Sequence, residues 1–91
     1  MKYETERLLT VSTAHLKETT ADKAEQGLLP VPCFNKGGYG WFIYVGDGEN
    51  DSLIDYPDLQ GLIDICRSEG CTWLCLDADG PLIDDLPKYE W

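Results

Sequence analysis

The apolar positions of this chain fall into four short runs, and each run predicts a β-strand. The first is RLLTV, residues 7–11. The second lies within LLPVPCF, where two prolines suit an edge strand because proline lacks a backbone donor. The third, residues 39–45, is rich in aromatic and β-branched residues, and the fourth, residues 71–76, is CTWLCL.

Two stretches between these runs predict helices. In TTADKAEQG, Thr19 is a candidate N-cap and Gly27 a candidate end of a short helix. A second helix is expected to start at Pro57 and end at Gly70. Within it, one buried stripe is predicted at positions i, i+3, i+4 and i+7, which are Leu59, Leu62, Ile63 and Cys66.

The predicted order of elements is β, α, β, β, α, β. This order predicts an α+β fold of the ferredoxin-like type, with an antiparallel sheet, two helices on one face and a short C-terminal tail. At 91 residues, the chain is expected to form a single domain that spans residues 1–91.

The third predicted strand resembles the aromatic signature of RNA-recognition-motif domains. Aligned on Gly38, the signature places Tyr39 and Trp41 on the open face of the sheet, where bases would stack, and turns Phe42 and Tyr44 toward the helices. The basic residue of the signature is displaced to Lys36, and the first strand lacks the partner aromatic. RNA binding is therefore a disfavoured alternative.

The net charge is a second argument against binding of nucleic acid. The net charge is −10, and the chain through Gly46 is balanced, so the whole excess lies in residues 47–91, where twelve acids accompany two bases. Because phosphate attraction supplies most non-specific affinity for nucleic acid, a chain with this charge repels it. We expect instead that Tyr39, Trp41 and Trp73 form an exposed aromatic sheet face for an adaptor partner or a homodimer.

Few residues of the chain are candidates for catalysis or metal binding. His15, in the motif STAHL, could pair with Ser12, Thr13 or a cysteine in a metal or thiol site. The cysteine spacings do not match a structural zinc site, and a loop fixed by hydrogen bonds is the simpler interpretation. We expect no catalytic residues, no metal, no cofactor and no enzymatic activity.

Two stretches, STAHL and LDADGPLIDDLPKYEW, resemble the landmarks of a family of small proteins of unknown function found on bacterial plasmids and prophages. The resemblance implies a context, because mobile elements often carry small acidic proteins that block host restriction or CRISPR systems. It brings no established activity.

Charge and context together predict a cytoplasmic, non-enzymatic interaction protein that mimics the charge of DNA and blocks a basic host protein that binds nucleic acid. No membrane segment and no direct contact with nucleic acid are expected. The residues expected to form the acidic partner-binding face are Asp47, Glu49, Asp51, Asp55, Asp58, Asp64, Asp77, Asp79, Asp84 and Asp85.

Overall fold

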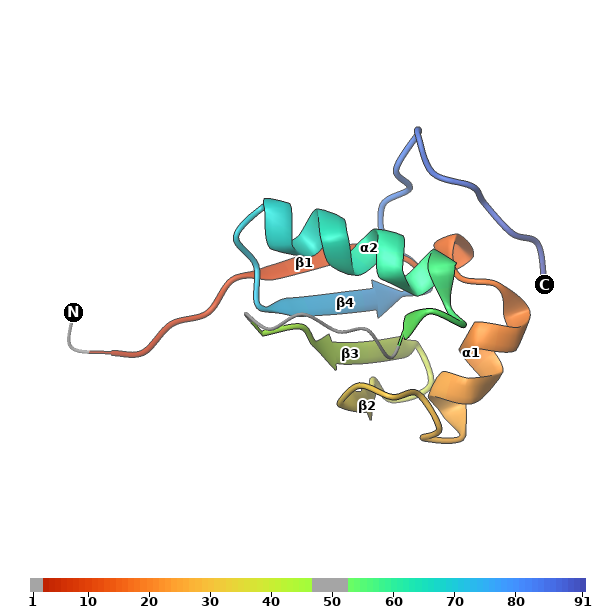
Figure 1. Ribbon diagram of the computed structural model, residues 1–91, viewed down its shortest axis with the longest axis horizontal. Helices are drawn as coiled ribbons and strands as arrows, with labels where there is room; N and C mark the ends of the chain where they lie inside the picture. The colour runs from red at the N-terminus through yellow and green to blue at the C-terminus, as the bar shows by residue number, and fades with distance from the viewer. Residues whose placement is uncertain (1–2, 47–52) are drawn as a thin grey trace.

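The computed structural model describes residues 3–46 and 53–91 (Figure 1). The elements, in chain order, are β1 (Leu8–Ser12), the short 3-10 helix η1 (Thr13–His15), α1 (Glu18–Glu25), β2 (Cys33–Asn35), β3 (Gly40–Tyr44), α2 (Pro57–Ser68) and β4 (Trp73–Asp77). The α+β class and the βαββαβ order predicted from the sequence are confirmed. No helix in the described ranges is long and apolar enough to cross a membrane.

The four strands form one sheet in the order β1-β4-β3-β2. Strand β3 runs antiparallel to both of its neighbours, whereas β1 runs parallel to β4, with Leu9 opposite Leu74 and Val11 opposite Leu76. The sheet is therefore mixed, and the expectation that it is antiparallel throughout is wrong for this one pair of strands.

The position of α2 explains the parallel pair. The first turn of α2 lies beside the chain that follows β1, since the Asp58 carboxylate accepts a hydrogen bond from the backbone N–H of Lys17 at 2.8 Å. At the other end of the helix, the backbone N–H of Thr72 donates to the carbonyl of Arg7, just before β1. Strand β4 consequently enters the sheet at the end where β1 begins and runs in the same direction.

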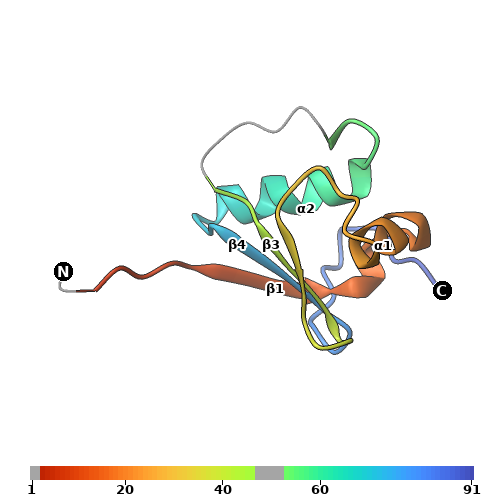
Figure 2. The same ribbon diagram turned by 90° about the horizontal axis from the view of Figure 1, so that it is seen from below.

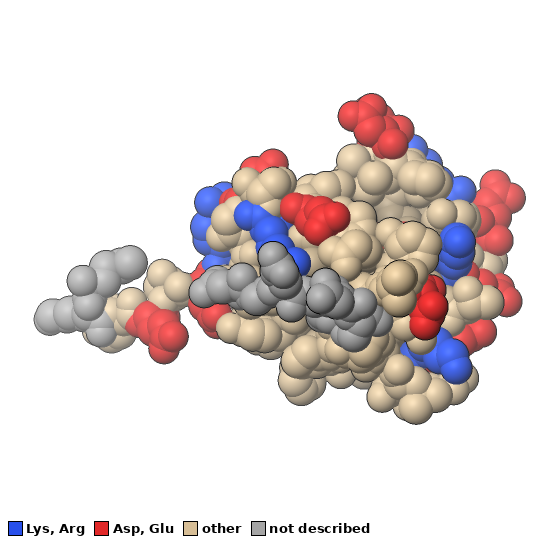
Figure 3. All heavy atoms as spheres, viewed as in Figure 1, with Lys and Arg blue, Asp and Glu red and all other residues tan. Residues whose placement is uncertain are grey.

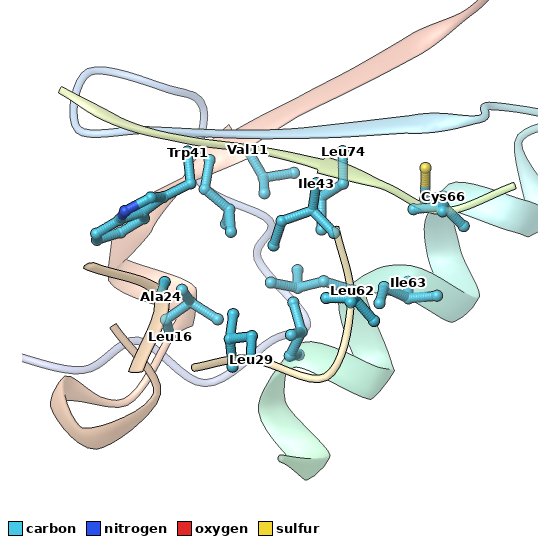
Figure 4. Packing of buried hydrophobic residues seen from close by; sticks show 14 of the residues in the cluster. Val11, Leu16, Ala24, Leu29, Trp41, Ile43, Leu62, Ile63, Cys66 and Leu74 are labelled. Carbon is cyan, nitrogen blue, oxygen red and sulfur yellow. The ribbon is translucent and has the colours of Figure 1, made fainter. Parts of the chain in front are cut away.

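Both helices lie on one side of the sheet (Figure 2). The buried side chains between the sheet and the helices form the core, with Val11, Ile43 and Leu74 directed toward Leu62 and Ile63 (Figure 4). The predicted stripe of α2 is confirmed, because its four members are all buried. The other side of the sheet is covered by no helix of the described residues.

The start of α1 differs from the prediction. Thr19 lies inside the helix, and Lys17 occupies the N-cap position without a side-chain cap. The carboxylate of Asp58, from α2, accepts hydrogen bonds from the backbone N–H of Lys17 and from the hydroxyl of Thr20 instead. A residue distant in sequence thus supplies the cap. Gly27, with a φ of +71°, follows the helix as predicted.

Candidate protein-binding surfaces

The aromatic residues of β3 point in the opposite sense to that predicted. Trp41 is only 8% exposed, and its indole N–H donates a hydrogen bond to the carboxylate of Glu25 on α1 at 3.2 Å. Figure 4 shows its ring on the same side as Ile43, toward Ala24. Tyr39 precedes the strand, in the turn before Gly40. The prediction that Tyr39 and Trp41 form an open aromatic face is therefore wrong.

The side of the sheet without helices carries a different aromatic cluster, which we call the open face. Its prominent side chains come from all four strands, and three of them are well exposed: Leu8 (45%), Phe34 (55%) and Tyr44 (40%). Trp73, half-buried at the centre, is 5.1 Å from Tyr44 and 6.1 Å from Phe34 between ring centroids. The members of the open face are Leu8, Phe34, Phe42, Tyr44 and Trp73. Of the predicted aromatic residues, only Trp73 lies there.

A shallow, almost wholly apolar hollow of about 330 Å³ lies on the open face. Its walls are Leu8, Phe34, Phe42 and Trp73. Of these four residues, only Trp73 could be placed on this face from the sequence. Both alternate sets of side chains in β3 are apolar, so the pattern does not reveal which set contacts the helices.

Charged groups lie at both margins of the open face. At one margin, Lys36 forms an ion pair with Asp77 at 2.8 Å and lies 5.8 Å from the centre of the Phe42 ring. The hydrogen bond from Lys36, followed by one from the backbone N–H of Asp79, lowers the pKa of Asp77. At the other margin, the Glu6 carboxylate accepts hydrogen bonds from the Trp73 indole at 3.2 Å and from the Thr72 hydroxyl at 3.3 Å.

The acidic residues predicted to form one partner-binding face differ in their structural environments. Asp47, Glu49 and Asp51 lie outside the described residues. Asp58 caps α1, and Asp77 pairs with Lys36, so these two carboxylates serve the fold. The remaining predicted acids have exposed side chains, and they are Asp55, Asp64, Asp79, Asp84 and Asp85. On the side seen in Figure 3, acidic groups stand apart, with uncharged and basic side chains between them.

His15 has a structural environment that accounts for the STAHL motif. Its side chain is only 3% exposed. Nδ1 donates to the carbonyl of Pro87 at 2.9 Å, while Nε2 accepts from the backbone N–H of Ile83 at 2.8 Å. The neutral imidazole with its proton on Nδ1 satisfies both bonds. Both ring nitrogens thus bind backbone groups of the C-terminal tail, the segment of residues 78–91 that follows β4.

The remainder of the motif binds the same tail. The Ser12 hydroxyl accepts from the N–H of Ala14, and the Ser12 N–H donates to the carbonyl of Pro81. Farther along the tail, the backbone N–H of Tyr89 donates to the Ala14 carbonyl. The indole N–H of Trp91 donates to the Leu16 carbonyl at 2.8 Å. Thr13 lies in η1 between these contacts. Ser12 thus binds a local backbone donor, as the interpretation of a fixed loop requires, and His15 adds bonds to the tail that the sequence did not indicate.

A single family model covers both the STAHL motif and the C-terminal tail that it contacts. The model of a family of unknown function, described as the DUF5983 C-terminal domain, matches residues 8–91. The chain belongs to the DUF5983 family. No curated protein and no solved structure matches it. The match includes β1, the STAHL motif and the tail that binds it, but it assigns no activity to this DUF5983 domain.

The thiol groups of this domain give little support to a reactive site. All four cysteines are free. Burial raises the pKa of the Cys66 thiol to about 11, and it also raises the pKa values of Cys33 and Cys75. A raised pKa leaves little of the reactive thiolate at neutral pH. Among the described residues, no group of three potential ligands is arranged to hold a metal ion.

Proposed function

We propose that this protein is a non-enzymatic interaction protein that binds a basic protein. The observation that carries the proposal is the set of exposed carboxylates in the second half of the chain, which follows a balanced first half. Asp64 on α2 and Asp84 and Asp85 on the tail are exposed to solvent. The negative electrostatic field of these carboxylates accelerates association with a positively charged partner, and it weakens as salt screens it.

In its more specific form, the proposal concerns a host protein that binds nucleic acid. The family resemblance to proteins of plasmids and prophages supports an anti-defence role in the cytoplasm, in which the acidic protein occupies a restriction or CRISPR protein's groove for DNA. Duplex DNA presents one phosphate per roughly 3.4 Å along each strand. A protein that reproduces only part of this spacing still competes for the same basic groove.

Charge reversal tests the proposal. We expect the double variant Asp84→Lys and Asp85→Lys to bind a basic, nucleic-acid-binding partner from bacterial lysate about tenfold more weakly than the unaltered protein at low salt. Retention on the immobilised protein, eluted with a sodium chloride gradient, measures this. The matched control is Glu4→Lys with Asp22→Lys, which changes the net charge equally in the balanced half.

Competition separates the two forms of the proposal. Duplex DNA added to the column displaces the partner if the protein occupies a DNA groove, and leaves it bound if the protein contacts another basic surface. Retention that does not depend on salt contradicts binding through charge. An equal loss in both double variants shows that total charge matters and that the acidic half has no special role.

A second candidate function is favoured by the open face. Three exposed apolar or aromatic side chains around Trp73, on a sheet face that no helix of the described residues covers, are typical of a protein-binding surface. An adaptor or a homodimer would use this surface, and Trp41 would not contribute because it is buried under α1.

A further inference from the structure

The open face offers a binding surface of mixed chemistry. Leu8 and Tyr44 lie opposite Trp73 on the two neighbouring strands, and the Phe34 ring from β2 is 6.1 Å from the Trp73 ring. The apolar hollow beside them is formed by side chains from all four strands. Because strands hold their side chains rigidly, such a hollow exists before a partner arrives and costs little ordering entropy on binding. Its apolar walls suit an aliphatic side chain.

The margins of the open face favour a cationic group next to that side chain. Lys36 already lies near the ring of Phe42, which shows that an ammonium group is accommodated over an aromatic ring of this surface. At the opposite margin, the Glu6 carboxylate is anchored to the Trp73 indole, while the side chain of Arg7 is near Gly70, in the turn after α2. A cation stacked on Trp73 would therefore meet both an aromatic ring and a carboxylate.

We propose that the open face binds a basic, amphipathic segment of a partner protein. An arginine or lysine of that segment stacks on Trp73 beside Glu6, and the neighbouring aliphatic side chain fills the hollow lined by Leu8 and Phe34. This inference rests on the proposed function in one respect, the positive charge of the partner. A second copy of the chain is the poorer occupant, because each copy carries a net charge of −10 and the two would repel.

Synthetic peptides test this inference directly. The first probe alternates arginine and leucine, and the second alternates arginine and serine at the same length and charge. Tryptophan fluorescence and calorimetry measure binding. We expect the arginine–leucine peptide to bind more tightly by about tenfold, because it alone buries apolar surface.

Three variants locate the binding. Phe34→Ser is expected to remove the preference for the leucine peptide, and Glu6→Gln to weaken both peptides. Leu28→Ser is the matched control, since Leu28 is 57% exposed, compared with 55% for Phe34, yet does not line the hollow. It should bind both peptides like the unaltered protein.

The remaining outcomes separate this inference from the proposed function. If both peptides bind equally and Phe34→Ser has no effect, the open face is not the site, although binding of basic partners stands. If neither peptide binds even at low salt, both proposals fail. Sedimentation that reveals a dimer abolished by Phe34→Ser, without peptide binding, assigns the open face to a second copy and overturns the inference.

Discussion

Gly40 shows how a single residue controls the approach of two central strands. It lies opposite Asp77 at the start of β3, with a φ of +147°, and an added Cβ would lie 1.7 Å from the carbonyl oxygen of Leu76. Because this neighbour is backbone within the sheet, it cannot move aside without disturbing the pairing of β3 with β4. Gly40 is thus required by both its conformation and its surroundings.

We therefore expect Gly40→Ala to lower the free energy of unfolding by at least about 2 kcal/mol. The measurement is chemical denaturation of the unaltered and variant proteins. Gly61→Ala is the control: an added Cβ there would approach no described residue outside its own helical turn within 4 Å, and alanine favours the helix α2. Gly61→Ala should be neutral or slightly stabilising. Equal stability of the two variants would show that the strands tolerate the added methyl group.

At the scale of elements, the C-terminal tail depends on His15. We expect His15→Phe to release the tail, because phenylalanine cannot accept from Ile83 or donate to Pro87 and leaves both backbone groups unpaired, at a cost of about 1–3 kcal/mol each. Hydrogen exchange measures the release as faster exchange of the amides of Ile83 and Tyr89.

The strands provide the internal control for this experiment. Amides in β3 and β4, such as Ile43 and Leu74, should keep their slow exchange if the tail detaches alone. Lys88→Ala is the matched variant, since its ammonium group contacts only carbonyls of the tail itself, Asp84 and Leu86, in the part of the chain that the structure describes. Unchanged exchange of Ile83 in His15→Phe would show that His15 does not hold the tail.

The elements themselves were largely predictable from the sequence, but their pairing was not. Pro57 and the apolar stripe after it locate α2 because a helix start and its periodicity are local features. Strand partners depend on connections across the whole chain, which explains why the parallel pairing of β1 with β4 was not foreseen. Likewise, no local pattern indicates that Asp58 caps α1.

The candidate site was predicted less well, for a reason specific to β3. Trp41 and Ile43 on one side of the strand are as apolar as Phe42 and Tyr44 on the other, so a shift of one residue exchanges the two faces without violating the pattern. The hydrogen bond from Trp41 to Glu25 fixes the choice, and it joins two different elements. Trp73, on a strand of the same mixed character, was assigned to the correct face.

At the scale of the whole molecule, the net charge of −10 on 91 residues opposes folding, since the compact state brings like charges together. The ion pair of Lys36 with Asp77 is partly open to solvent and offsets little of this repulsion. Salt screens interactions between exposed charges over about 10 Å at 0.1 M, which is comparable to the distances between groups on one small domain. Screening should therefore stabilise the fold.

We expect the melting temperature to rise by a few degrees between about 0.02 M and about 0.5 M sodium chloride. Differential scanning calorimetry measures the shift, and chloride is preferred to sulfate because sulfate also strengthens apolar burial. The variants Asp84→Lys with Asp85→Lys and Glu4→Lys with Asp22→Lys each reduce the net charge from −10 to −6, so both should respond less to salt. The acidic-half variant should respond least, because it reverses two charges in the half of the chain that carries the whole negative excess. A melting temperature that falls with salt would mean that attractive ion pairs outweigh the excess of negative charge.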